Sequence, residues 1–194
     1  MATASLTRPF ISGLLPQDRT ARIAMQIGLA IAGTLFLTLA AKTKVVLGPV
    51  DLSLGTLGIF LVAALFGSRL GLATVLLYMA EGAAGLPVFQ SSPEKGVGLF
   101  YMLGTTGGYL AGYVVAAAMI GWAADRGWDR NLLKIGGTMA AGTLVILALG
   151  YAWLSMLIGS EAALTAGVLP FLLGDAIKVG LAASMVVAAR SLRA

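Results

Sequence analysis

Two ionisable side chains of opposite charge, Asp175 and Lys178, interrupt an apolar stretch near the end of the chain. The stretch covers residues 170–183 and reads PFLLGDAIKVGLAA. A separation of three residues places both side chains on one face of a helix. Ionisable residues inside a membrane helix cost about 2.5–3.5 kcal/mol each on insertion scales, so they usually mark a functional site. We predict that the pair binds a ligand; the alternative is a self-satisfied pair that only fixes helix packing.

The composition indicates that the chain lies in a lipid bilayer. Of its 194 residues, 59% are hydrophobic and 11% are charged, whereas soluble domains average about 25% charged residues. The mean hydropathy is +0.95. A soluble fold could not cover that much apolar surface, but lipid solvates it directly. The net charge of +5 comes from basic residues in short connections between apolar stretches, which favours membrane topology over nucleic-acid binding as its explanation.

Six apolar stretches are candidates for helices across a hydrocarbon core about 30 Å thick. They cover about 22–41, 53–67, 70–86, 103–124, 132–157 and 168–189. The second and third are separated only by residues 67–69, so these two should pack as an antiparallel hairpin. The expected fold is an all-α integral membrane protein, a compact bundle of six transmembrane helices with irregular outer loops. Residues 1–194 then form a single membrane domain, with a flexible cytoplasmic N-terminal tail over about 1–18 that does not resemble a signal peptide.

The basic residues orient this bundle, because short cytoplasmic loops carry an excess of Lys and Arg. With the N-terminus inside, nine basic residues lie in inner segments: Arg8, Arg19, Arg22, Arg69, Arg126, Arg130, Lys134, Arg190 and Arg193. Three lie in outer segments: Lys42, Lys44 and Lys95. This split predicts a multi-pass protein of the bacterial cell (inner) membrane with both termini in the cytoplasm. It also places Asp175 and Lys178 in the outer half of the last span.

Two outer connections, residues 86–100 and 159–168, are semi-apolar and rich in small residues. Irregular backbone near membrane depth persists only where protein or a wet cavity satisfies its polar groups. These segments could cover a pocket that opens outward, or they could be ordinary loops. Glu81, near the outer end of the third span, is either a ligand-binding residue beside that pocket or an interfacial residue. Asp51 is expected to cap the second span or to lie at the interface.

Small residues recur at every fourth position in two spans, a spacing that lets helix backbones approach closely. In the fourth span, where we expect packing within the chain, they are Gly104, Gly108, Gly112 and Ala116. In the first span, where they could instead face another protein, they are Ala24, Gly28 and Ala32.

The chain lacks the residues on which much enzymatic chemistry depends. It has no Cys and no His, which excludes disulfides, thiol or imidazole catalysis and the usual zinc sites. It has no GxxxxGK(S/T) phosphate loop, so it cannot hydrolyse ATP by itself. A binding or transport protein without a cofactor therefore fits the sequence better than an enzyme does.

Three motifs follow one another along the chain: VDLSLGTLGIFLVAALFGSRLGLATVLLYMAEGAAGLPVF, GTTGGYLAGY and PFLLGDAIKVGLAA. In this order and spacing they resemble the BioY family, the substrate-binding S components of biotin transporters of the energy-coupling-factor (ECF) type. The resemblance covers about residues 20–190. Two places depart from the common pattern: Gly55 stands where many relatives have Gln, and QSSPEKGVG lacks the double glycines often found there.

The resemblance implies high-affinity biotin binding near the outer face of the bundle, with Asp175 and Lys178 as ligand contacts. A carboxylate suits the N–H donors of the ureido ring, and an ammonium suits either the ureido carbonyl or the valerate carboxylate. Candidates for the walls around the apolar parts of the ligand are Leu54, Thr56, Tyr78 and Tyr109. Gln90 and Ser91 could supply further hydrogen bonds.

The resemblance also implies protein partners, a transmembrane coupling protein and two ATPase subunits. Docking would use the small residues of the first helix, which here are Ala24, Gly28 and Ala32. The alternatives are an S component for another small vitamin and a membrane assembly protein that binds no ligand.

Overall fold

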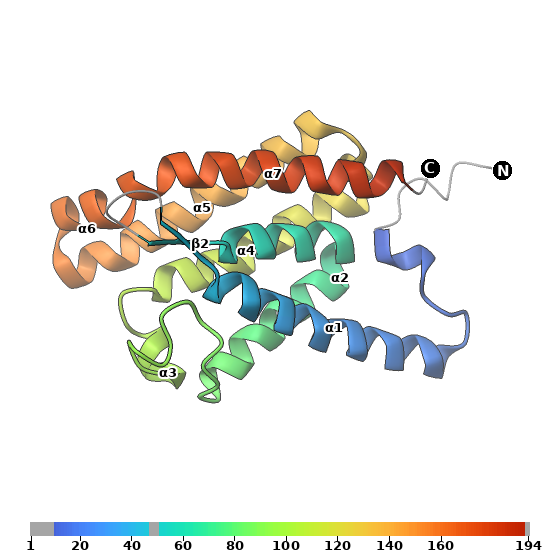
Figure 1. The fold of residues 1–194 in the computed structure, drawn as a ribbon, viewed down its shortest axis with the longest axis horizontal. Helices are drawn as coiled ribbons and strands as arrows, with labels where there is room; N and C mark the ends of the chain where they lie inside the picture. Colours follow the sequence, from blue (N-terminus) through green and yellow to red (C-terminus); the bar gives the residue numbers. More distant parts are fainter. Residues whose placement is uncertain (1–9, 47–50, 193–194) are drawn as a thin grey trace.

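The computed structural model describes residues 10–46 and 51–192, most of them in helices (Figure 1). The long helices are α1 (Arg19–Lys42), α2 (Gly55–Ala83), α4 (Gly107–Asp125), α5 (Leu132–Ile158) and α7 (Leu172–Ser191). The short ones are α3 (Gly98–Met102), α6 (Ser160–Gly167) and the 3₁₀ helices η1 (Phe10–Gly13), η2 (Trp128–Arg130) and η3 (Leu169–Phe171). Within the described ranges, five helical stretches are long and apolar enough to cross a membrane, the last running from α6 through α7.

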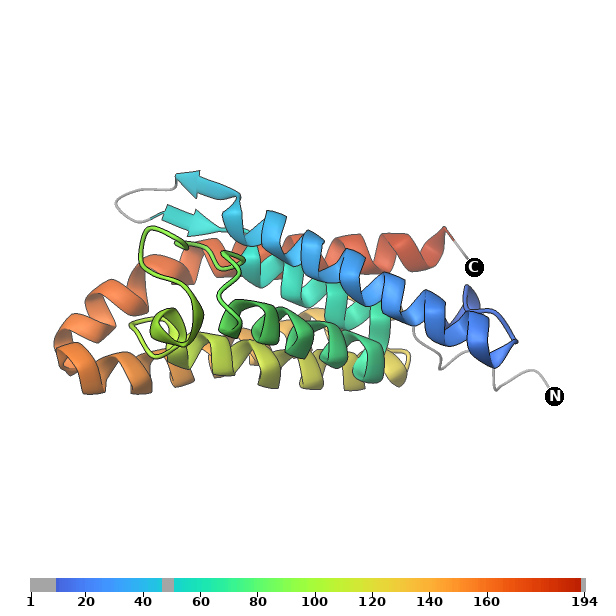
Figure 2. The same cartoon turned by 90° about the horizontal axis from the view of Figure 1, so that it is seen from below.

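Helix α2 accounts for two of the six expected spans, because it reverses direction at Gly67. This residue has φ 79° and ψ −176°, a conformation that glycine adopts without strain. The two arms run in opposite directions in both views (Figure 1 and Figure 2). A Cβ added to Gly71 in the second arm would lie 3.0 Å from the Cα of Ala63 in the first. The tight turn was predicted at this place, and the bundle contains six long helical segments in its described part.

Asp125 at the end of α4 fixes this bend from outside α2. The amide of Ser68 donates a hydrogen bond to Asp125 Oδ1 at 3.2 Å, and the Ser68 hydroxyl donates to Oδ2. The first N–H groups of a helix have no partner within it, so the carboxylate satisfies the start of the second arm. We call this end of the molecule, marked by Gly67, the bend end, and the opposite end, marked by residues 84–97, the loop end.

The contact between α4 and α5 depends on the small residues of α4. A Cβ added to Gly108 would lie 2.2 Å from Leu149 O, and one added to Gly112 would lie 2.7 Å from Ile146 Cα. Ala116 is fully buried, with the backbone of Gly142 close to it. The prediction that this stripe packs within the chain is confirmed for Gly108, Gly112 and Ala116, because larger side chains would separate the two backbones. Gly104 lies in a turn before α4, where its carbonyl accepts a hydrogen bond from Trp153 of α5 at 2.8 Å.

A two-stranded hairpin joins α1 to α2, which the sequence did not predict. Strand β1 (Lys44–Val46) pairs antiparallel with β2 (Asp51–Ser53), with Lys44 opposite Ser53. Asp51 therefore belongs to a strand, and the residue that precedes the first turn of α2 is Leu54. Of the two alternatives for Asp51, the cap of the second span was wrong, because Asp51 pairs in a strand and the helix begins after Leu54. Its place at the membrane interface stays a prediction.

The two expected irregular connections differ from each other. Residues 84–97 form turns that lead into α3. In contrast, most of the 159–168 segment is helix α6, so its predicted irregularity was wrong. The SEAALTAG sequence of α6 contains several good helix formers, and Glu161 in its first turn favours the helix dipole. Both segments, together with the β-hairpin, gather at the loop end (Figure 2).

Helix α1 lies along one side of the bundle and leaves much of its own surface uncovered (Figure 2). Ala24, Gly28 and Ala32 are all exposed, and nothing approaches within 4 Å of a Cβ added to Gly28. Large apolar side chains of α1 are exposed as well, with Leu35 at 62% and Leu39 at 68%. Such a surface is stable in contact with lipid or with another apolar protein face.

Residues of the expected N-terminal tail pack against the bend end. Ile11 in η1 is 7% exposed, and the Arg190 guanidinium lies 5.8 Å from the centre of the Phe10 ring. Arg190 also forms an ion pair with Asp129, which is fully buried in η2. These contacts tie the start and the end of the described chain together at the bend end.

Candidate ligand-binding site

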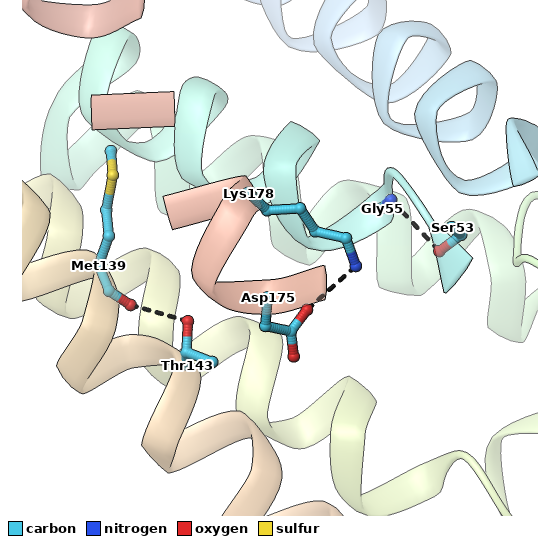
Figure 3. Close-up of polar contacts among 6 residues, drawn as sticks. All are labelled: Ser53, Gly55, Met139, Thr143, Asp175 and Lys178. Carbon is cyan, nitrogen blue, oxygen red and sulfur yellow. Dashed lines mark hydrogen bonds and ion pairs between the residues drawn. The ribbon is translucent and has the colours of Figure 1, made fainter. Parts of the chain in front are cut away.

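Asp175 and Lys178 form a buried ion pair in the first turns of α7. Lys178 Nζ donates a hydrogen bond of 3.0 Å to Asp175 Oδ1 (Figure 3). The residues are 5% and 6% exposed. The expected i, i+3 placement on one helix face is thus present. Figure 3 shows the Lys178 side chain reaching past Asp175 on the side where Ser53 and Gly55 mark the start of α2.

The pair borders a cavity of about 640 Å³ at the loop end. Pockets for small molecules are usually of this size, with mainly apolar walls and a few well-placed polar groups. Segments from every long helix and from the connections at the loop end contribute to its wall. The described lining residues are Ala41, Lys44, Ser53, Gly55, Thr56, Tyr78, Phe89, Gln90, Ser91, Lys95, Tyr101, Thr105, Thr106, Tyr109, Leu110, Tyr113, Ile146, Leu147, Leu154, Ile158, Ala166, Gly167, Phe171, Asp175 and Lys178.

The structure brings together seven of the nine residues that the sequence put forward for ligand binding. They are Thr56, Tyr78, Gln90, Ser91, Tyr109, Asp175 and Lys178. Leu54 is half-buried next to the lining residues Ser53 and Gly55 but is outside the described lining. Glu81 is also outside it, and accepts a hydrogen bond of 3.0 Å from Thr34 Oγ1 of α1. In this structure Glu81 therefore joins α2 to α1 rather than facing the cavity.

An aromatic cluster forms one wall of the cavity. Phe89 stacks on Tyr101 with ring centres 5.1 Å apart, and Phe89 and Tyr78 meet at nearly a right angle with ring centres 5.3 Å apart. Tyr78 donates a hydrogen bond to the carbonyl of Val88 at 3.0 Å, which fixes the segment that carries Phe89. Sequence reasoning named Tyr78 but missed Phe89 and Tyr101. The signal for Phe89 was present, since it is the aromatic residue that ends the GLPVF motif.

Two tyrosines of α4, Tyr109 and Tyr113, also line the cavity. Tyr109 donates a hydrogen bond of 2.7 Å to Gly167 O, which connects α4 with the end of α6. Its ring fits against Gly150 of α5, where an added Cβ would lie 2.2 Å away. Tyr113 was missed by sequence reasoning, although its position four residues after Tyr109 in GGYLAGY places it on the same helix face.

Residues 89–92, which border the cavity, are hydrogen-bonded to α1. Lys42, at the end of α1, donates hydrogen bonds to the backbone carbonyl and the hydroxyl of Ser92. Ser92 is 1% exposed and donates in turn to Phe89 O at 2.8 Å. The aromatic wall is therefore linked to α1 through a chain of polar contacts.

These features define a class: a polytopic helical membrane protein with a pocket that lies beside a buried ion pair and near the connecting segments at one end. The described residues contain no group of three or more His, Cys, Asp or Glu side chains that could hold a metal ion. The pocket can therefore offer a ligand charge-assisted hydrogen bonds at its interior, hydroxyl and amide groups along its sides, and aromatic surfaces for apolar atoms.

The comparison with known families is specific. A family model described as "BioY family" matches residues 13–194. The chain belongs to the BioY family, and the resemblance seen in its motifs is confirmed.

Individual relatives agree over most of the chain. A "Probable biotin transporter BioY" of Pyrococcus horikoshii is 33% identical over 159 residues, which cover 82% of this chain and 92% of that protein. The "Biotin transporter BioY" of Thermotoga maritima is 34% identical over 151 residues, which cover 77% and 86%.

The fold also matches a solved structure. The crystal structure of the S-component for biotin from an ECF-type ABC transporter has a TM-score of 0.77 to this chain at 23% sequence identity. The match covers 91% of this chain and 95% of the other. At this identity the likeness establishes the shared fold.

Proposed function

We propose that this protein is the biotin-binding membrane subunit of a biotin uptake transporter. The observation that carries the proposal is the buried Asp175–Lys178 pair at a cavity of about 640 Å³ in a BioY-family chain. Relatives in this family are named biotin transporters. The subunit captures its ligand and performs no covalent chemistry.

The chemistry of the pocket suits the parts of biotin. The ureido ring has two N–H donors and a carbonyl acceptor, for which Asp175 and Lys178 are complementary partners. The fused sulfur ring and the aliphatic chain require apolar walls, which Phe89, Tyr101 and Tyr109 provide. Charge-assisted hydrogen bonds in a pocket that excludes water are strong and directional.

Energy for transport comes, in this proposal, from separate subunits, a transmembrane coupling protein with two ATPases. The exposed surface of α1 around Ala24, Gly28 and Ala32 is the docking face for the coupling protein. The bend end, which carries seven of the nine predicted inner basic residues, faces the cytoplasm with both termini, in the bacterial cell (inner) membrane. The other two, Arg8 and Arg193, lie outside the described residues. The loop end then faces outward.

Direct binding tests this function. The purified full-length chain in detergent or nanodiscs, freed of co-purified ligand, should bind biotin with an affinity in the nanomolar range when titrated by calorimetry. Thiamine and riboflavin serve as comparison ligands and should give no heat of binding. A folded sample that binds neither biotin nor the other vitamins would overturn the proposal, and one that prefers another vitamin would reassign the ligand.

A further inference from the structure

A cluster of arginine and tryptophan side chains lies at the bend end, where α4 is followed by η2. It consists of Trp122 and Arg126 at the end of α4 and of Trp128 and Arg130 in η2. Both arginines are exposed, and Trp122 is 47% exposed. The proposed function gives none of these four side chains a role in binding the vitamin or a protein partner.

Arg126 is held in place by an aromatic ring. Its guanidinium carbon lies 3.5 Å from the centre of the Trp122 ring. Trp122 packs in turn against Trp128, with ring centres 5.7 Å apart and ring planes at 77°. A cation over an indole is attracted by the negative face of the ring. At this separation the flat face of the guanidinium is toward the ring, so the N–H groups around its edge remain available to an oxyanion.

The two carboxylates nearest to these arginines in the sequence are engaged with other groups. Asp125 accepts hydrogen bonds from the amide and the hydroxyl of Ser68 at the bend of α2. Asp129 is fully buried and forms its ion pair with Arg190. Among the described residues, neither arginine of the cluster forms an ion pair. The cluster therefore presents positive charge on the surface, while the nearby negative charge is held by groups of the protein itself.

Apolar side chains are exposed directly after the cluster in the chain. Leu132 and Leu133 begin α5 and are 49% and 85% exposed. Tryptophan and arginine at the end of a membrane span are typical of the level of the lipid headgroups, and exposed leucines suit the acyl chains next to them. The surface thus offers partners for both parts of a phospholipid, its oxyanion and its hydrocarbon.

We propose that this cluster binds the phosphate of an anionic phospholipid in the leaflet at the bend end, with Arg126 as the main contact and Leu133 beside the acyl chains. The inference goes beyond the proposed function, because it assigns a second binding site at the opposite end of the molecule from the cavity. A lipid fits this surface better than a free phosphate or an acidic protein segment does, since it brings negative charge and hydrocarbon together at the membrane boundary.

The size of the effect follows from the charge and from its fixed orientation. Each cation close to an anionic membrane surface strengthens binding by about fivefold. Arg126 should contribute at least that much, because Trp122 already orients its guanidinium. A lysine at this position keeps the charge but has no flat face and no paired N–H donors, so it should restore only part of the affinity. Added salt should weaken the preference, because mobile ions screen exposed charges.

The test compares phosphatidylglycerol with phosphatidylcholine of the same acyl chains. Each lipid is titrated into the full-length protein in a neutral detergent, and the rise of the thermal unfolding midpoint gives its relative affinity, since a ligand that binds the folded state stabilises it. The unaltered protein should prefer phosphatidylglycerol by about tenfold or more. Arg126→Gln should lose about fivefold of this preference, and Arg126→Lys should lose less.

Two further variants make the comparison specific. Arg22→Gln is the matched control, because Arg22 is an exposed arginine of α1 at the same end of the molecule, and it should keep the full preference. Trp122→Leu removes the ring beside Arg126 without changing the charge, and it should also lower the preference. Either Arg126→Gln or Trp122→Leu is sufficient for the test if it retains a cooperative unfolding transition.

Four results would overturn the inference. The first is equal affinity of the unaltered protein for the two lipids. The second is an equal loss in Arg22→Gln and Arg126→Gln, because diffuse positive charge would then explain the binding. The third is inorganic phosphate that stabilises the protein as much as phosphatidylglycerol does, which assigns the cluster to a free anion. The fourth is an Arg126→Gln variant that keeps the lipid preference but impairs biotin uptake by cells, which assigns the cluster to a protein partner.

Discussion

At the scale of single residues, the Asp175–Lys178 pair has hydrogen-bonding capacity to spare. One hydrogen bond, from Lys178 Nζ to Asp175 Oδ1, joins the two groups. An ammonium has three N–H donors, and a carboxylate accepts about four hydrogen bonds. A ligand can therefore bind both groups at once without breaking the pair, which explains how a buried ion pair can serve recognition as well as packing.

We expect Asp175→Ala to weaken biotin binding by about 100-fold or more, because the ureido donors lose a charged acceptor and Lys178 is left as an unpaired buried cation. Calorimetric titration of the purified variant measures this. Asp175→Asn, which keeps the shape and one acceptor oxygen, should bind biotin more tightly than Asp175→Ala and more weakly than the unaltered protein.

Glu161→Ala is the matched control for this experiment, since Glu161 is an exposed carboxylate of α6 outside the described lining of the cavity. It should leave the affinity unchanged. Thermal unfolding of each variant establishes that the sample is folded. Normal biotin affinity in a folded Asp175→Ala variant contradicts the assignment of this residue to the site.

At the scale of elements, the end of α1 contacts the segment that carries the lining residues Gln90 and Ser91. Lys42 contacts Ser92, and Ser92 contacts Phe89, whose ring belongs to the aromatic wall. Glu81 and Thr34 form a second polar contact between α1 and α2. A movement of α1 would therefore reach residues 89–92 through Lys42, and α2 through the contact between Thr34 and Glu81.

Lys42→Met should release biotin about tenfold faster, because it keeps a long flexible side chain but removes a charged donor worth about 1.5–3 kcal/mol. A chase of bound labelled biotin with unlabelled biotin measures the dissociation rate. Lys134→Met, at the other end of the bundle, should dissociate at the normal rate. An unchanged rate in Lys42→Met would show that the contact with Ser92 does not hold the covering segment closed.

Much of this arrangement of elements was predictable from the sequence, because lipid makes hydrophobic length a strong signal. The bend at Gly67 follows from the short polar break between two apolar stretches. The shared helix face of Asp175 and Lys178 follows from their spacing of three residues. The α4 glycines indicate close packing because few other residues permit it. Each of these features is determined by residues that are close together in the sequence, so the sequence alone was enough to predict it.

The remaining features depend on contacts between distant segments, which the sequence does not encode locally. Tyr101 lines the cavity because α3 places its ring against Phe89. The residues around Tyr101 in the sequence show no pattern that predicts this contact. Glu81 is one side chain among several near the loop end, and its partner Thr34 lies 47 residues away. The β1–β2 hairpin consists of two three-residue strands, too short for a recognisable alternation of polar and apolar residues.

At the scale of the whole molecule, the pocket and the surface of α1 lie on different parts of one compact bundle. The cavity is at the loop end, whereas Ala24 and Gly28 lie in the part of α1 nearer the bend end (Figure 2). This separation lets the protein hold a ligand while another protein contacts its side. It also makes the proposed ligand binding and the proposed docking separable by mutation, since nothing approaches within 4 Å of a Cβ added to Gly28.

We expect Gly28→Leu to impair biotin uptake by cells about tenfold or more while leaving biotin binding by the purified subunit unchanged. A bulky side chain at the centre of a close helix contact prevents the backbones from approaching, and overpacking of this kind typically costs 1–3 kcal/mol. Uptake of labelled biotin in cells that express the coupling protein and ATPases measures the first effect, and calorimetry the second. Gly180→Leu is the matched control, because Gly180 is an exposed glycine of α7 with equally open surroundings. If both leucine variants lose uptake to the same degree, or if Gly28→Leu also loses binding, the exposed face of α1 is not a docking surface.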